Sequence, residues 1–471
     1  MDLKTNIEQN LAMLKSTLPF GKSFDLLERV LETKDRKFYL FYIKGLSKET
    51  NFEFVRRDLC SLDQETLNEI KTGEDFIHKA VSTVGAKTEK DIGKIVTALL
   101  TGKIIIMFDG SATSVIIDLR IYPTRKVSEP DKEKVLRGAK DGFVETIIFN
   151  TTLIRRRIRD PHLIFSMHII GDVSKTEVAI GYLSNKVDKR ALNVIEDKIK
   201  ALKIDALTVS GETLIEALEG KRWHNPLPKV RFTERPDVAA AKITEGKIVL
   251  IIDNTPCVII LPTGFLDFTR DVDDYYMPII TGNYLKFVRS LIMVINLLLT
   301  PLYVLVVNNP EAVPLSMEFL LPKVAINVPL FIQFLILEVA VDGLKLASLN
   351  TPDALGTSLS VIGGLILGEY AVSTGWLIPH AILYMALVAL SSYTQPSIEM
   401  GYSIKFFRII LLICVGLCGI WGLIAGLVFI GVVLFRTKTL TGESYLYPVI
   451  PFDWAVLKPL IFRTRMKNRG E

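Results

Sequence analysis

Hydrophobic and polar positions are distributed differently in the two parts of this chain. Up to about residue 284, short apolar runs alternate with charged stretches of helical spacing. Beyond that point, long apolar runs dominate, and only 11 of the chain's 107 formally charged side chains lie between Ser290 and Phe435. An apolar run of about 20 residues with few charges is typical of a helix that crosses a membrane. The pattern therefore predicts a water-soluble amino-terminal region followed by a membrane domain.

The soluble region contains one pattern that occurs twice. Residues 102–120 read GKIIIMFDGSATSVIIDLR, which is two apolar strands around an Asp-Gly turn. Residues 246–262 read GKIVLIIDNTPCVIILP and align with the first hairpin at an offset of 144. A strand-like segment precedes each hairpin, and the two segments are separated by an offset close to 140. We therefore predict two related α/β modules, each with a mixed sheet covered by helices.

The composition along the chain divides it into six predicted segments, three of them short. In order, these are an N-terminal helix at 1–23, module 1 at 24–125, a linker at 126–140, module 2 at 141–284, a helical polytopic transmembrane domain at 285–436, and a basic tail at 437–471. The start of the chain lacks a basic segment followed by an apolar run, so it does not resemble a signal peptide. We therefore expect the soluble region and both termini to be cytoplasmic, which requires an even number of crossings.

Hydropathy predicts four full crossings in the membrane domain, at 287–307, 355–375, 379–395 and 409–435. The apolar stretch 326–346 differs because it carries Glu338, Asp342 and Lys345 at spacings that place them near one helix face. A charged face does not tolerate contact with lipid tails. We expect this helix to be partly immersed, and to pack against protein or line water.

Acidic residues at membrane depth are the main candidates for function. An ionised carboxylate there requires water or a counter-charge, and acids repeated around an oligomer axis would attract cations. The alternative is an internal salt bridge with Lys345, Lys405 or Arg408. The candidates for a pore or ion pathway are Glu338, Asp342, Glu369 and Glu399.

Two further groups of residues are candidates for contacts rather than for chemistry. A basic cluster at the end of a predicted helix could bind a partner domain, a neighbouring subunit or lipid phosphates. Alternatively, it could be a solvated helix face whose charges complement the helix dipole. Its members are Arg155, Arg156, Arg157 and Arg159. Gly422 and Gly426 lie four residues apart in an apolar run, a spacing that allows close helix packing.

The sequence offers little for catalysis or for binding a metal or cofactor. It contains no phosphate-binding glycine loop, no GxSxG and no HExxH, and its five histidines have no metal-ligand spacing. Asp109 and Asp253 are expected to be turn residues. The segment from Arg436 to Glu471, with seven basic and three acidic residues, lacks the aromatic interleaving of a nucleic-acid surface. We therefore expect no enzyme activity, no cofactor, no metal site and no nucleic-acid partner.

Four segments resemble the GerA family of bacterial spore germination proteins, of the A-subunit type. They are EPDKEKVLRGAKDGFVETIIFNTTLIRRRIRD at 129–160, TERPDVAAAKITEGKIVLIIDNTPCVIILPT at 233–263, PLFIQFLILEVAVDGLKLA at 329–347, and YLYPVIPFDW at 445–454. The resemblance covers nearly the whole chain from about residue 24. Glu369 departs from it, because a glutamine is usual at that position.

The resemblance implies a multi-pass protein of the inner spore membrane that acts in germination. It implies a homo-oligomer, expected to be a pentamer, that conducts monovalent cations and works with other germination membrane proteins in the lipid bilayer. A non-conducting scaffold and a nutrient-receptor A subunit remain as alternatives. A secondary transporter would require inverted repeats in the membrane half, and the sequence shows none.

Overall fold

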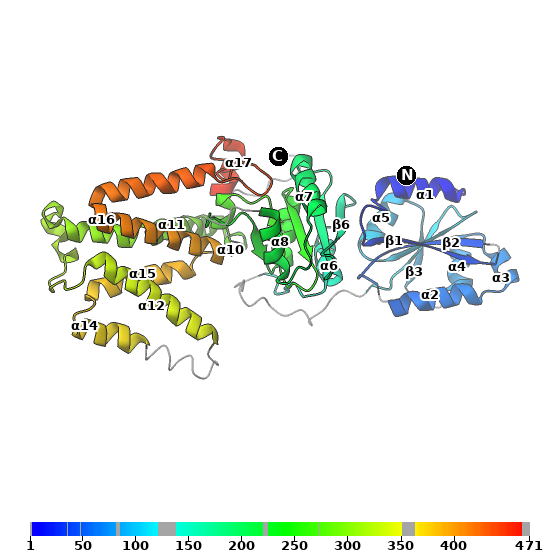
Figure 1. The fold of residues 1–471 in the computed structure, drawn as a ribbon. Coiled ribbons are helices and arrows are strands. Elements are labelled where there is room, and N and C mark those ends of the chain that lie inside the picture. Colours follow the sequence, from blue (N-terminus) through cyan, green and yellow to red (C-terminus); the bar gives the residue numbers. More distant parts are fainter. Residues whose placement is uncertain are drawn as a thin grey trace. The chain divides into compact units, whose positions relative to one another are not determined.

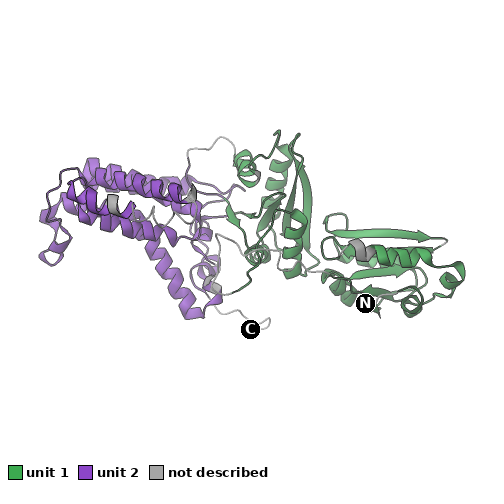
Figure 2. Cartoon of the chain, turned by 90° about the horizontal axis from the view of Figure 1, so that it is seen from below, with its two compact units in different colours: residues 1–221, 230–262 green, residues 222–229, 263–471 purple. Residues whose placement is uncertain are grey.

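The computed structural model describes residues 2–34, 36–47, 49–81, 85–120, 138–219, 225–271, 273–350 and 363–463. The chain divides into two compact units (Figure 2). Unit 1 comprises residues 1–221 and 230–262, and unit 2 comprises residues 222–229 and 263–471. Most of the predicted linker lies outside the described residues.

Unit 1 contains two five-stranded antiparallel sheets with the same topology (Figure 1). The first has the strand order β1-β2-β4-β5-β3 and the second the order β6-β7-β9-β10-β8. The strands are β1 (Leu26–Thr33), β2 (Arg36–Ile43), β3 (Ala86–Glu89), β4 (Ile104–Phe108), β5 (Ser114–Ile117), β6 (Leu163–Ile170), β7 (Thr176–Leu183), β8 (Arg231–Thr233), β9 (Ile248–Ile252) and β10 (Val258–Leu261). The two related α/β modules predicted from the repeated hairpin are confirmed.

Helices pack against both sheets of unit 1. They are α1 (Ile7–Thr17), α2 (Glu49–Ser61), α3 (Gln64–Glu69), α4 (Gly73–Ala80), α5 (Ile92–Leu100), α6 (Ile147–Arg157), α7 (Lys189–Ala201), α8 (Ser210–Glu219) and α9 (Pro236–Thr244). The hairpin strands β4, β5, β9 and β10 are buried along their whole length. Strands covered on both faces are continuously apolar, which explains why the hairpins are so visible in the sequence.

The two turn aspartates connect each hairpin to the first helix of its module. Asp109 Oδ1 accepts a hydrogen bond from the backbone N–H of Ile7 at 3.3 Å, and Asp253 Oδ1 accepts one from Ile147 at 3.0 Å. A carboxylate at a helix N-terminus satisfies a free N–H and complements the helix dipole. The equivalent contacts in both modules give the two aspartates a structural role.

The predicted N-terminal helix is not a separate segment, because α1 belongs to the core of module 1. Leu14 of α1 is fully buried and packs in one cluster with Ile95 of α5 and Ile105 of β4. The apolar face of α1 therefore covers the first sheet.

Module 2 is shorter than predicted. The sequence predicted it at 141–284, whereas its last strand ends at Leu261 and the chain from Thr263 belongs to unit 2.

One buried ion pair joins the two modules within unit 1. Arg155 of α6 bonds to both carboxylate oxygens of Asp25, at 2.8 and 3.0 Å. The Arg155 side chain is fully buried and lies over the ring of Phe165, with 5.1 Å from Cζ to the ring centroid. Ser23 donates to Asp25 at 2.5 Å and also accepts from Phe165 N–H. Asp25 directly precedes β1, so this bidentate ion pair connects the start of module 1 to module 2.

Unit 2 is built mainly from helices. They are α10 (Asp273–Tyr276), α11 (Ile279–Asn308), α12 (Leu330–Asn350), α14 (Ala371–Ser373), α15 (Pro379–Tyr393), α16 (Ile398–Arg436) and α17 (Trp454–Ile461), with the short helical turns η1 (Phe265–Thr269), η2 (Pro310–Ala312), η3 (Leu315–Leu320) and η4 (Leu365–Tyr370). Among the described residues, α11 and α16 are long and apolar enough to cross a membrane, and α15 is a shorter apolar helix. Part of the crossing predicted at 355–375 lies outside the described residues.

The last predicted crossing, 409–435, is not one continuous span. Gly419 has φ 58° and ψ −134°, which breaks the helical path inside α16. A Cβ on Gly422 would overlap the carbonyl oxygen of Cys414, and one on Gly426 would lie 2.5 Å from Leu411 Cδ2. Residues 420–436 therefore fold back along residues 398–418, and the two glycines allow these arms to approach closely. Gly419 can make the turn because glycine adopts positive φ without steric cost.

The described part of the predicted basic tail packs within unit 2. Tyr445 is fully buried, and its hydroxyl donates to Pro228 O at 2.8 Å. Its ring contacts Phe265 and Phe268, both at 6.5 Å between centroids. Burial raises the pKa of the Tyr445 hydroxyl. Leu440, Tyr445 and Leu457 are therefore part of the core of unit 2, whereas Phe452 and Trp454 of the same segment are exposed.

Replacing Arg155 with methionine should loosen the junction between the modules. The change leaves the Asp25 carboxylate buried without its counter-charge, at a cost of about 3–5 kcal/mol. Hydrogen exchange of the full-length chain in detergent should quicken in peptides that contain Asp25 and Phe165. Arg159→Met, which removes an exposed arginine of the same cluster, is the matched control. Equal exchange in the two variants would contradict a clamping role.

Replacing Gly422 with valine should destabilise the α16 hairpin. The added side chain meets the Cys414 backbone of the opposite arm, and overpacking of this kind costs about 1–3 kcal/mol. Gly431→Val is the matched control, because a Cβ there meets no atom within 4 Å. Thermal unfolding of the detergent-solubilised chain measures both. If Gly431→Val destabilises the chain as much as Gly422→Val, the arms do not pack through Gly422.

Candidate functional site

Four charged side chains of α12 and α16 form one network inside unit 2. Arg408 Nε donates to Glu338 Oε1 at 2.7 Å, and Lys405 Nζ lies 3.2 Å from Glu338 Oε2. Lys405 also donates to Asp342 Oδ2. The spacing of four residues between Glu338 and Asp342 places both acids on one face of α12. The spacing of three between Lys405 and Arg408 does the same for the two bases of α16.

The network is buried among apolar helices. The side chains of Glu338 and Arg408 are each 3% exposed, that of Lys405 is 14% exposed, and that of Asp342 is 33% exposed. Two acids and two bases leave the network formally neutral. A buried ion pair is tolerated only when its partners and remaining hydrogen-bonding groups are satisfied. The pairing explains how α12 carries these acids without facing lipid.

Helix α11 contributes the polar end of the network. Arg408 Nη1 donates to the backbone carbonyl of Asn296 at 3.0 Å and also to its side-chain oxygen. Asn296 and Thr300 are buried and lie one turn apart on α11. The guanidinium of Arg408 therefore connects α16 to both α11 and α12.

Several buried polar atoms around the network have no protein hydrogen-bond partner among the described residues. They are Asn296 Nδ2, Thr300 Oγ1, Glu338 Oε2 and Asp342 Oδ1. Glu338 Oε2 is close enough to Lys405 for an ion pair, but it lacks the alignment of a hydrogen bond. Leaving such atoms unsatisfied costs about 1–3 kcal/mol each, so a polar cluster of this kind requires water.

The structure brings together only two of the four acids predicted for an ion pathway. Glu338 and Asp342 share the network, whereas Glu369 is exposed on η4. Glu399 lies at the start of α16, where its carboxylate accepts a hydrogen bond from Ser397 at 2.6 Å. Lys345 forms no ion pair within 4 Å with these acids among the described residues. It donates to Ser392 Oγ at 3.3 Å and lies over the Tyr393 ring.

The predicted arginine cluster separates into different roles. Arg155 forms the buried junction with Asp25 described above. Arg157 bonds to both carboxylate oxygens of Asp141 at 2.6 Å. Arg156 and Arg159 are exposed. Only one member therefore lies in the interior, and it binds a partner 130 residues away in the sequence.

Some residues of the site were not predicted from the sequence. Gln333 of α12 is fully buried and accepts from Ile378 N–H at 2.9 Å while donating to Val328 O at 2.7 Å. Thr300 was also missed. A signal existed for Thr300, because Asn296 and Thr300 are polar residues four apart in an otherwise apolar run. No group of His, Cys, Asp and Glu side chains in the described ranges is suited to hold a metal ion.

The outer faces of the long helices are apolar. Large hydrophobic side chains are exposed along α11 and α16, including Phe287, Leu291, Leu417 and Trp421. Soluble monomers rarely expose continuous apolar surface of this extent. The polar network inside and the apolar surface outside are arranged as in a helical membrane protein.

Comparisons with known proteins find relatives that match nearly the whole chain. The family model described as "Bacillus/Clostridium GerA spore germination protein" matches residues 13–471. Stage V sporulation protein AF of Bacillus subtilis (strain 168) is 32% identical over 98% of this chain and 92% of its own length. Spore germination protein A1 of the same organism is 27% identical over 99% of this chain and 96% of its own.

One solved structure is also similar. It is the crystal structure of the N-terminal domain of the A subunit of the Bacillus megaterium spore germinant receptor GerK3, with 24% identity and a TM-score of 0.41. It covers 56% of this chain and 98% of that chain. The resemblance found in the sequence motifs is confirmed by the family model and the relatives. The chain belongs to the GerA family of Bacillus/Clostridium spore germination proteins.

Proposed function

We propose that this chain is a multi-pass membrane subunit of an oligomer that conducts monovalent cations during spore germination. The observation that carries the proposal is the buried network of Glu338, Asp342, Lys405 and Arg408. Four charges inside apolar helices are not needed for stability, since buried pairs are rarely more stable than apolar packing. Charges retained inside apolar helices are typical of ion and proton pathways.

Water provides the second argument. The unpartnered atoms of Asn296, Thr300 and Asp342 lie around the same network, and hydrating them would create a continuous polar strip along α11 and α12. Asp342, one third exposed, forms the outer end of this strip. Several copies around an axis would enclose these strips in a shared hydrated route. The soluble modules would then assemble the oligomer or transmit its stimulus.

A non-conducting scaffold is the second candidate function. It is favoured by the size of unit 1, which supplies two folded modules outside the apolar helices. In a scaffold the network would serve only to fix the packing of α11, α12 and α16. A scaffold and a channel therefore differ in whether neutralising Glu338 changes ion flux.

Neutralising Glu338 should reduce cation flux through proteoliposomes that contain the full-length chain. Glu338→Gln leaves the charge of Arg408 uncompensated beside the route, and a barrier higher by about 1.4 kcal/mol reduces flux tenfold. The double variant Glu338→Gln/Arg408→Gln removes both charges and should recover part of the flux. Glu369→Gln, which neutralises an exposed acid, should leave it unchanged.

Potassium release from loaded vesicles measures these effects, and light scattering of the solubilised chain reports the number of subunits. Absence of flux in the unaltered chain, or equal flux in Glu338→Gln and Glu369→Gln, would favour the scaffold. A monomer would also contradict the proposal, because a shared route requires several copies.

A further inference from the structure

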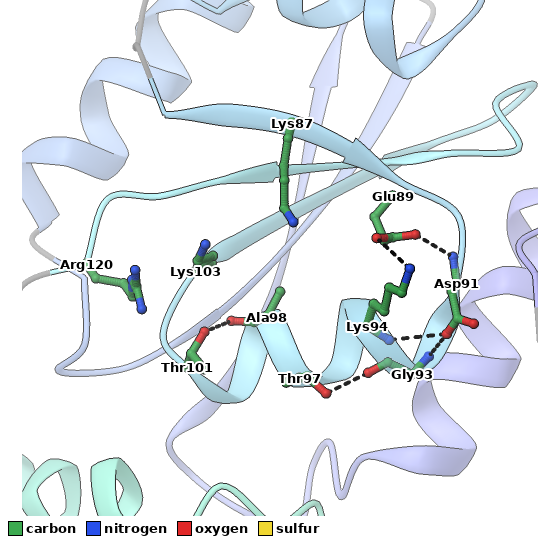
Figure 3. Close-up of a pocket in the computed structure, with 10 residues that line it drawn as sticks. All are labelled: Lys87, Glu89, Asp91, Gly93, Lys94, Thr97, Ala98, Thr101, Lys103 and Arg120. Atoms are coloured by element: carbon green, nitrogen blue, oxygen red, sulfur yellow. Dashed lines mark hydrogen bonds and ion pairs between the residues drawn. The ribbon is translucent and has the colours of Figure 1, made fainter.

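Module 1 has a pocket that the proposed ion pathway does not use. It lies between the edge strand β3 and helix α5, next to the residues that precede β4 and follow β5 (Figure 3). Its volume is about 500 Å³. Pockets that hold small molecules commonly have volumes of about 300–1,000 Å³. The charges of its lining decide which ligands it can hold.

One end of the pocket is formed by acids that are already engaged. Glu89 Oε1 accepts from the backbone N–H groups of Lys90 and Asp91, at 3.1 and 3.2 Å. Asp91 Oδ1 caps α5 by accepting from the N–H groups of Gly93 and Lys94. These backbone hydrogen bonds lower the pKa of both carboxyl groups. The acids are therefore ionised structural groups that close this end.

The other end carries an excess of positive charge. Arg120 bonds to both oxygens of Asp118 at 2.6 Å, and Lys103 Nζ lies 3.2 Å from the same carboxylate. The two cations hold the pKa of Asp118 at about 2. Lys87 points from β3 toward α5 in the same pocket (Figure 3) and has no ion pair within 4 Å among the described residues. Three cations and one carboxylate leave a formal charge of +2.

Module 2 has the same topology and keeps two of these three cations. At the offset of 144, Lys87 corresponds to Arg231 and Lys103 to Lys247, whereas Arg120 corresponds to Gly264. Asp118 corresponds to Pro262, whose carbonyl accepts from Lys247 at 2.6 Å. Module 2 therefore forms its sheet without the Arg120–Asp118 pair. This pair is the part of the cationic end that module 2 does not repeat.

Hydroxyl groups on α5 complete the recognition surface. Thr97 donates to Gly93 O at 2.8 Å and Thr101 donates to Ala98 O at 2.7 Å. Because the proton of each hydroxyl is already used, its oxygen can accept a hydrogen bond from a ligand. The pocket therefore combines a doubly positive end with acceptor groups along one wall.

We propose that this pocket binds a small organic dianion, a dicarboxylate or a phosphate monoester that also carries a hydroxyl or amino donor. Charge-assisted hydrogen bonds from Lys87, Lys103 and Arg120 would hold the anionic groups. The hydroxyls of Thr97 and Thr101 would accept from the donor. The site lies entirely in module 1, so it holds whether or not unit 2 conducts ions.

Calorimetric titration of the full-length chain in neutral detergent tests the proposal at low ionic strength. The probes are malate and glycerol 3-phosphate, with acetate as a monoanion control. We expect both dianions to bind at least tenfold more tightly than acetate. Lys87→Gln should weaken dianion binding about tenfold, since one of three cations is lost. Lys87 is exposed, so its replacement leaves the fold intact.

The matched control is Lys90→Gln, which removes the same charge three residues away and outside the pocket lining. It should change binding less than twofold. Failure of both dianions to bind, or equal weakening by the two substitutions, would overturn the proposal. So would binding confined to vesicles of anionic phospholipid and lost in Lys87→Gln, because the pocket would then recognise a membrane surface.

Discussion

The helical unit depends on one constraint, which is that the charge of Arg408 cannot be buried without an acid beside it. Glu338 meets this requirement at 2.7 Å, and the contact fixes α16 against α12. The remaining donors of Arg408 reach Asn296 and so add α11 to the same point. Breaking a buried ion pair costs several kcal/mol. The Arg408–Glu338 contact therefore restricts the relative positions of α11, α12 and α16 more than their apolar contacts do. Arg155 and Asp25 apply the same constraint in unit 1.

Local patterns were sufficient to predict the architecture of unit 1. The paired hairpins appeared in the sequence because their strands are buried on both faces and therefore uniformly apolar. The turn residues Asp109 and Asp253 appeared because a hairpin needs them at a fixed place. In unit 2, charges at intervals of three or four identified the polar face of α12, and Lys405 and Arg408 of α16 were predicted as alternative salt-bridge partners for its acids. Each of these features depends on neighbours in the sequence.

Contacts between distant residues could not be predicted in the same way. Nothing near Asp25 marks it as the partner of Arg155, because the pair is defined only when the two modules meet. The helix α1 looked separate because its amphipathic face does not reveal which sheet it covers. The run 409–435 looked like one span because apolar composition is the same in a straight helix and in a hairpin. Only the backbone at Gly419 distinguishes the two.

The pairing of charges in unit 2 also limits how it could conduct ions. As described, each acid of the network is matched by a base, so a cation entering the strip meets no net attraction. Conduction would require Lys405 or Arg408 to move away from the acids, or the acids to turn toward water. Separating the pairs in a low-dielectric interior is unfavourable, so the conducting arrangement would be a minor state in the absence of a stimulus. The same contacts that hold α12 and α16 together would therefore limit cation flux through the unstimulated chain, and a shift of one helix would raise it.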